Sequence, residues 1–154
     1  MGQQSSTSGA PDWYDFPDTV LHFRSMPEFV VDLRKEIDLA TRTLLRQIGL
    51  ERSFGIVTAH NPMGVAQPAD VNARLAASLQ IDVAKLQATH RYLDACSPDR
   101  SHCEQSIAIV LELQSLIVLA CRYNQLAIFW FDGDVFWIVP ARSSNARLRL
   151  PASV

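Results

Sequence analysis

The stretch Leu126-Ala-Ile-Phe-Trp-Phe131, Asp132-Gly133, Asp134-Val-Phe-Trp-Ile-Val139 decides the fold, because it is the strongest β-hairpin signal in the chain. Two runs of aromatic and branched apolar residues flank an Asp-Gly pair, which supplies the positive φ angles of a type I′ turn. A two-residue turn of this kind pairs Phe131 with Asp134. The sequence therefore predicts an antiparallel hairpin over residues 126–139.

The predicted hairpin is apolar on both faces. Alternation along the two strands places Leu126, Ile128, Trp130, Val135, Trp137 and Val139 on one face, and Ala127, Phe129, Phe131, Phe136 and Ile138 on the other. An antiparallel pair with one wet face alternates apolar and polar residues instead. We therefore expect helices on one face, and the N-terminal segment, a second subunit or a ligand pocket on the other.

Upstream of the hairpin, apolar periodicity and turn residues predict five further strands and three helices. The strands are expected at residues 19–24, 28–33, 53–59, 89–95 and 105–110, and the helices at residues 38–48, 68–79 and 113–123. Residues 82–87 can add a further helical turn. Asp38 is the predicted N-cap of the first helix, and Gly49 and Asn124 end the first and third helices. The predicted fold class is α+β, with a mixed or mostly antiparallel sheet of five to seven strands and about three helices.

The predicted organisation is a single α+β domain over residues 17–141. A chain of 154 residues with 48% hydrophobic content can bury one core of ordinary size. Residues 1–16 lack periodicity and are expected to form a disordered segment, from which Trp13, Tyr14 and Phe16 can dock on the body. Residues 142–154 are expected to form a flexible tail.

Charge and motifs exclude several function classes. The formal net charge is −2 and the arginines are spread along the chain, so neither nucleic acid nor a membrane surface is an expected partner. The polar, uncharged first residues predict a cytoplasmic location, and no apolar stretch has the length of a membrane-spanning helix. The six glycines are too scattered for a nucleotide-binding loop, so no cofactor is expected.

The three cysteines are Cys96, Cys103 and Cys121, without a C-x-x-C motif. An odd and sparse set differs from the even disulfide frameworks of small secreted domains, so reduced thiols are expected. Cys96 and Cys103 with His90 and His102 fit no standard zinc-finger spacing, so no metal site is predicted.

The first candidate site is Thr58-Ala-His-Asn-Pro-Met-Gly64, which joins a predicted strand to a predicted helix. Such a junction directs free backbone N–H groups at anions or carboxylates. His60 can act as a base or donor, Asn61 and Asn72 can donate and accept, and Arg74 can clamp an anion. An ordinary Asn-Pro turn followed by solvated helix residues explains the same pattern equally well.

The second candidate site is Asp99-Arg-Ser-His-Cys-Glu-Gln-Ser106. In a strand, His102, Glu104 and Ser106 share one face, and a His and a Glu at this spacing can act as an acid–base pair. The alternative interpretation is a polar strand edge. Gln125 precedes the hairpin, where a buried amide needs partners and can satisfy backbone groups.

Three short motifs resemble those of a known family. They are T-A-H-N-P-x-G at residues 58–64, followed by Asn72, then H-x-E-x-S at residues 102–106 and Q-x-A-x-F at residues 125–129. With these motifs, the chain resembles the bacterial domain-of-unknown-function family 3293 over about residues 19–139. The resemblance implies a compact single-domain bacterial protein and brings no established activity. It also implies an aromatic residue in many members where His60 stands, which shifts the prediction toward the other polar residues.

Two functions from different classes fit these residues. In the first, a pocket formed by residues 58–74 and 102–106 binds a small polar or anionic ligand, phosphorylated ligands included. The predicted ligand-binding residues are His60, Asn61, Asn72, Arg74 and Gln125, and the predicted catalytic residues are Glu104 and His102. In the second, the hairpin over residues 126–139 serves a non-catalytic interaction or forms a homodimer. The sequence leaves open whether the protein is an enzyme.

Overall fold

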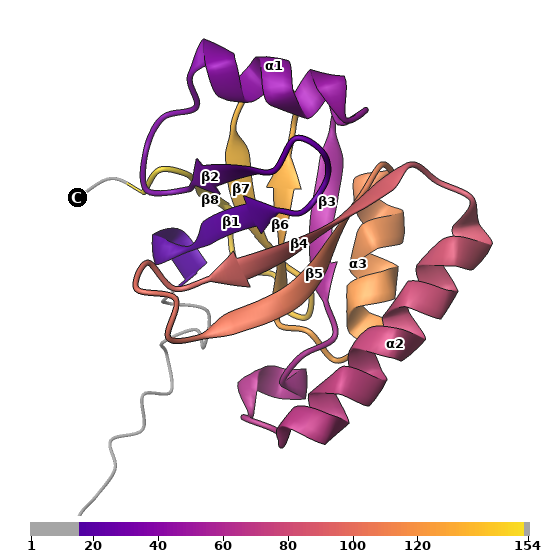
Figure 1. Ribbon diagram of the computed structural model, residues 1–154. Coiled ribbons are helices and arrows are strands. Elements are labelled where there is room, and N and C mark those ends of the chain that lie inside the picture. Colours follow the sequence, from indigo (N-terminus) through magenta and orange to yellow (C-terminus); the bar gives the residue numbers. More distant parts are fainter. Residues whose placement is uncertain (1–15, 153–154) are drawn as a thin grey trace, which may run out of the picture.

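The computed structural model describes residues 16–152, which form one curled sheet with three α-helices around it (Figure 1). The strands are β1 (Val20–Phe23), β2 (Phe29–Asp32), β3 (Phe54–Thr58), β4 (His90–Cys96), β5 (Cys103–Ile109), β6 (Ala127–Phe131), β7 (Phe136–Pro140) and β8 (Leu148–Arg149). The helices are α1 (Leu39–Gln47), α2 (Ala69–Leu86) and α3 (Leu113–Arg122), and two short 3₁₀ turns are η1 (Phe16–Asp18) and η2 (Pro62–Gly64). The disorder predicted for residues 1–16 lies, apart from Phe16, outside the described residues.

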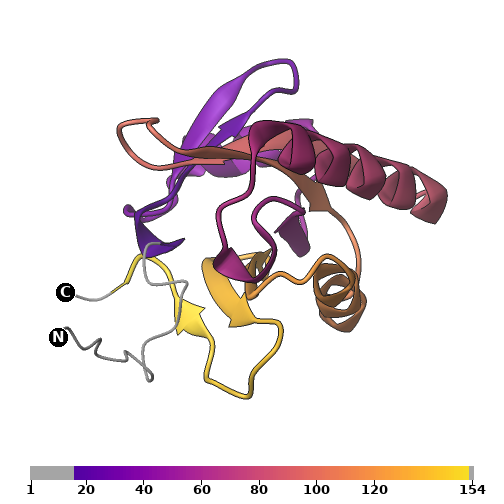
Figure 2. The same cartoon turned by 90° about the horizontal axis from the view of Figure 1, so that it is seen from below.

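All strands pair antiparallel, in the order β2-β1-β4-β5-β3-β6-β7-β8, and the sheet curls into a half-barrel (Figure 2). The class is α+β, but the prediction of five to seven strands was wrong, because the sheet has eight. The additional strand, β8, lies in the segment where the sequence predicts none. It consists of two residues that pair with β7, next to the buried Leu150. A strand this short has no periodicity, so only its tertiary pairing defines it.

The C-terminal hairpin of β6 and β7 has a wider turn than predicted. Phe131 pairs with Phe136 rather than with Asp134, so the loop spans residues 132–135. The Asp132 carboxylate accepts hydrogen bonds from two backbone N–H groups of the loop, at 2.8 and 2.9 Å, and Gly133 has a φ of +101°. Because the register differs by two residues, every strand side chain still lies on its predicted face.

Both faces of the hairpin are buried against other parts of the chain. Trp130 and Val139 belong to a cluster that packs against α2 and α3. Phe129 and Phe136 belong to a second cluster on the other face, which includes residues of α1. The N-terminal segment is one of the three elements predicted to pack on this second face. It contributes Phe16, whose ring centroid lies 5.5 Å from that of Phe129.

The helices α1 and α3 confirm the predicted elements. Asp38 caps α1 by accepting a hydrogen bond from the Thr41 N–H at 2.8 Å, and Asn124 ends α3 with a φ of 56°. The helix α2 continues to Leu86, past the predicted end at residue 79, because Val83 extends its buried face. None of the helices within residues 16–152 combines the length and the hydropathy needed to cross a lipid bilayer.

Cys96 and Cys103 form a disulfide bond, so the prediction of reduced thiols was wrong for this pair. The two residues are cross-strand partners at the connected ends of β4 and β5. Their pairing depends on the register of these strands, and spacing along the chain does not reveal it. The third cysteine, Cys121, forms no disulfide bond.

Candidate functional site

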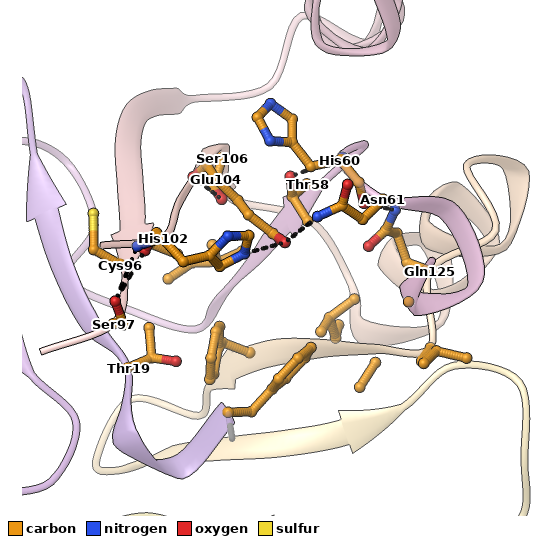
Figure 3. Close-up of a pocket in the computed structure, with 18 of the residues that line it drawn as sticks. Thr19, Thr58, His60, Asn61, Cys96, Ser97, His102, Glu104, Ser106 and Gln125 are labelled. Atoms are coloured by element: carbon orange, nitrogen blue, oxygen red, sulfur yellow. Dashed lines mark hydrogen bonds and ion pairs between the residues drawn. The ribbon is translucent and has the colours of Figure 1, made fainter. Parts of the chain in front are cut away.

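One end of the curled sheet holds a pocket of about 380 Å³ (Figure 3). The strand register assembles it, because Thr58 at the end of β3 pairs with Ser106 of β5, and Glu104 of β5 pairs with Ala95 near the end of β4. The strand β6 begins at this same end, since it runs antiparallel to β3. The helix α1 lies at the opposite end, where Arg42 bonds the loop that follows β6.

The pocket combines apolar and polar walls. The apolar lining consists of Phe16, Ile56, Gly64, Ala66, Ala95, Cys96, Leu126, Ala127, Ile128 and Phe129. The polar lining consists of Thr19, Thr58, His60, Asn61, Ser97, His102, Glu104, Ser106 and Gln125. Among these described lining residues, Glu104 is the only carboxylate and none is a lysine or an arginine.

Glu104 is the centre of the polar wall (Figure 3). Its Oε2 atom lies 3.0 Å from Nε2 of His102 and accepts a hydrogen bond from Nδ2 of Asn61 at 3.3 Å. No donor within the described residues bonds its other oxygen, Oε1. The side chains predicted as an acid–base pair are therefore in contact, and one carboxylate oxygen has no protein donor in the described chain.

Asn61 hydrogen-bonds the Glu104 carboxylate, and Asn72 fixes the position of Asn61. The backbone of Asn61 is left-handed, with a φ of 48°, which asparagine tolerates better than most residues. Its Oδ1 accepts hydrogen bonds from the Gln67 N–H at 3.0 Å and from Nδ2 of Asn72 at 2.9 Å, while Oδ1 of Asn72 accepts from the Asn61 N–H at 2.9 Å. Asn72 is not part of the pocket lining, so it acts by positioning Asn61.

Gln125 presents an acceptor to the pocket. Its side-chain N–H groups donate to the carbonyl oxygens of His60 at 3.0 Å and Tyr123 at 3.2 Å, which fixes the orientation of the amide. The residue is only 6% exposed, and no described donor bonds its Oε1 atom. Figure 3 shows this oxygen turned toward the pocket. Gln125 therefore satisfies backbone groups, as predicted for a buried amide, and also offers one acceptor to a ligand.

The side chains of His60 and Arg74 do not join the hydrogen-bond network around Glu104. Burial lowers the pKa of His60, and the negative charge of Glu104 opposes this effect. Its ring points away from the Glu104 carboxylate (Figure 3), so the residue contributes mainly its backbone. Arg74 lies outside the pocket and forms an exposed ion pair with Asp70 at 3.7 Å. Residues two positions apart on a helix face different directions, which separates Arg74 from Asn72.

Sequence reasoning missed the apolar wall of the pocket and Ser97. One signal was available, because a ligand pocket is among the predicted covers of the hairpin face that carries Ala127 and Phe129. For Ser97 the sequence offers only a turn-forming stretch. The hydroxyls of Thr58 and Ser106 lie in the pocket wall but donate to backbone carbonyls at 2.8 and 3.0 Å, so they stabilise the strand ends.

The loop that carries His102 is held by Asp99. One oxygen of this carboxylate, Oδ1, accepts hydrogen bonds from the Ser101 N–H at 3.0 Å, the Ser101 hydroxyl at 2.8 Å and the Ser97 hydroxyl at 2.9 Å. These bonds, the backbone bond first, lower the pKa of Asp99 to about 2. The disulfide bond between Cys96 and Cys103 closes the same loop. Together these contacts fix the backbone on which His102 enters the pocket.

Asp99 makes the stability of the protein depend on pH. A carboxyl group with a lowered pKa in the folded state contributes stability above its ordinary pKa of 3.8, and this contribution is lost as the pH falls through about 2. The asparagine side chain of the D99N variant would keep the acceptor without titrating. We therefore expect wild type to lose more stability than D99N between pH 4 and about pH 2, measured by urea unfolding at each pH. Parallel pH profiles of the two proteins would contradict this role.

Comparison with known proteins finds one family model that matches the central part of the chain. The family model described as "Protein of unknown function (DUF3293)" matches residues 57–128. This match confirms the predicted resemblance, over a shorter range than the expected residues 19–139. No curated protein and no solved structure matches the chain. Most residues of the pocket lining, including Asn61, Glu104 and Gln125, lie within the matched range.

Proposed function

Since the segment that matches the DUF3293 family forms most of this pocket, we propose that the protein binds a small ligand there. The ligand places an apolar body against the rings of Phe16 and Phe129 and a polar end against Glu104. A pocket of about 380 Å³ falls within the size range of small-molecule sites. Its mixture of apolar lining and few oriented polar groups is typical of such sites.

One observation carries this proposal. Glu104 is held by His102 and Asn61 through one oxygen only, and its second oxygen remains without a protein donor in the described chain. This oxygen is accessible to solvent, because no fully buried side-chain oxygen in the described residues lacks a partner, so a ligand donor would replace water there. A ligand donor completes the set. The adjacent His102 would then lie beside the bound group, and acid–base chemistry by this pair stays a prediction.

The proposal is tested by blocking the pocket without disturbing the fold. Ala66 lines the pocket and is exposed, so a Trp side chain in A66W can fill the pocket mouth at little cost to the core. Ala77 is exposed on α2 and does not line the pocket, so A77W is the matched control. In a thermal-shift screen of small metabolites, we expect to find compounds that raise the midpoint of thermal unfolding of wild type and A77W but not that of A66W. Equal shifts in all three proteins, or no shift in any, would contradict the proposal.

The anionic ligand predicted from the sequence has less support than a neutral or cationic one. Arg74, the residue predicted to clamp an anion, lies outside the pocket and pairs with Asp70. The carboxylate of Glu104 repels an anion placed beside it. We therefore include neutral and cationic compounds in the proposed ligand class.

Self-association through the hairpin is less favoured by the geometry. In the described part of the chain, both hairpin faces pack against the protein's own helices, strands and Phe16. Light scattering on a size-exclusion column would show a dimer if the hairpin served as an interface. The cytoplasmic location stays a prediction, and the disulfide bond between Cys96 and Cys103 argues against it because such bonds are rare in that compartment.

A further inference from the structure

We infer that the ligand of this pocket is an amine, whose ammonium group donates to Oε1 of Glu104. This inference rests on the proposed function and narrows it to one chemical class. It draws on three features of the pocket: the kind of polar atom left free, the sign of the charge, and the nature of the apolar wall.

Two free side-chain oxygens, on two sides of the pocket, are hydrogen-bond acceptors, while the Thr19 hydroxyl in the lining can donate or accept. Oε1 of Glu104 and Oε1 of Gln125 have no donor among the described residues. The amide of Gln125 cannot turn to present its N–H groups, because both His60 and Tyr123 use them. Gln125 is more than nine-tenths buried as a residue, but its Oε1 atom stays accessible from the pocket, because no fully buried side-chain oxygen in the described residues lacks a partner. The complementary ligand is therefore a donor, and an ammonium group carries three donors and no acceptor.

Apart from the two histidines, His60 and His102, the pocket lining within residues 16–152 carries a single ionisable side chain, that of Glu104. Glu104 is the only lining residue with a full negative charge, and the described lining contains no lysine or arginine to neutralise it. A partly buried carboxylate with one free oxygen favours a cation over a neutral donor, because a charge-assisted hydrogen bond is roughly twice as strong as a neutral one.

The apolar wall favours an amine with a hydrophobic body. Phe16 and Phe129 both line the pocket and contact each other, with ring centroids 5.5 Å apart. Aromatic rings bury apolar surface and also attract cations through their faces. An alkyl or aromatic amine can therefore bury its body here while its ammonium group reaches Glu104.

The test uses three probes with a common phenyl group. They are 2-phenylethylamine, 2-phenylethanol and phenylacetate, and their Kd values are measured by ligand-observed NMR titration of wild type, E104Q and E112Q. Gln at position 104 keeps an acceptor for His102 and Asn61 but places an N–H group where the free oxygen stands. Glu112 is exposed and outside the pocket lining, so E112Q changes the net charge equally without changing the site.

We expect wild type to bind the amine about tenfold more tightly than the alcohol, and phenylacetate most weakly. E104Q should lose this tenfold preference, and E112Q should retain it. Equal affinity for the amine and the alcohol, or tighter binding of phenylacetate, would overturn the amine class while leaving a ligand pocket in place. Absence of binding by all three probes at millimolar concentration would overturn both the amine class and the proposed function.

Discussion

Replacing Asn61 by alanine is expected to destabilise the protein by about 3 kcal/mol, because this side chain makes three hydrogen bonds worth roughly 1 kcal/mol each. The N–H of Gln67 and the side chains of Asn72 and Glu104 all lose a partner. Alanine also tolerates the left-handed backbone at this position less well than asparagine. Urea unfolding of wild type and N61A measures the loss.

The glycine variant N61G separates the two causes. Glycine loses the same hydrogen bonds but adopts a φ of 48° without strain. We expect N61G to be more stable than N61A by about 1 kcal/mol, and still less stable than wild type. If both variants unfold like wild type, Asn61 does not connect η2, α2 and β5 as described.

Replacing Gly55 by valine is expected to cost a similar amount, about 3 kcal/mol, for a different reason. Gly55 lies in the middle of β3, where α3 packs directly on the sheet. A Cβ atom at this position would lie 2.6 Å from Cδ1 of Leu116, which is fully buried. The leucine must leave its place, and the dense core offers little room for it. Thermal unfolding of G55V and wild type measures the loss.

A double-mutant cycle with Leu116 tests this explanation. L116A alone is expected to cost about 2–5 kcal/mol, because it leaves a cavity between α3 and β3. In the L116A background, G55V should cost much less than in wild type, since the valine can occupy part of that cavity. Additive losses in the cycle would show that contact with Leu116 is not the reason for glycine at residue 55.

The parts of the fold that the sequence predicts correctly are governed by local patterns. Alternation along residues 126–139 predicts the two faces of the hairpin, and it survives the change in turn because the register differs by an even number of residues. Caps such as Asp38 and Asn124 define helix ends through contacts within a few residues.

The parts that the sequence misses depend on pairing between distant segments. The strand β8 has two residues and forms because β7 offers an edge. The disulfide bond between Cys96 and Cys103 follows from the register of β4 and β5. Both require knowledge of the strand order, which periodicity does not contain.

The candidate site shows the same division. The contact between His102 and Glu104 agrees with the prediction from strand alternation, although His102 lies just before β5. The hydrogen bond from Asn61 to Glu104 exists because β3 and β5 are neighbours in the sheet. The apolar hairpin face only suggests a pocket as one of several covers, and the place of Phe16 in that wall depends on how the sheet curls.

The most direct test of the proposed amine pocket is a residue-resolved NMR titration of ¹⁵N-labelled protein with 2-phenylethylamine. We predict that the side-chain amide signals of Asn61 and Gln125 and the backbone signals of residues 102–106 shift together with a single Kd. Shifts confined to surfaces away from these residues, or an unchanged spectrum at millimolar amine, would contradict this prediction.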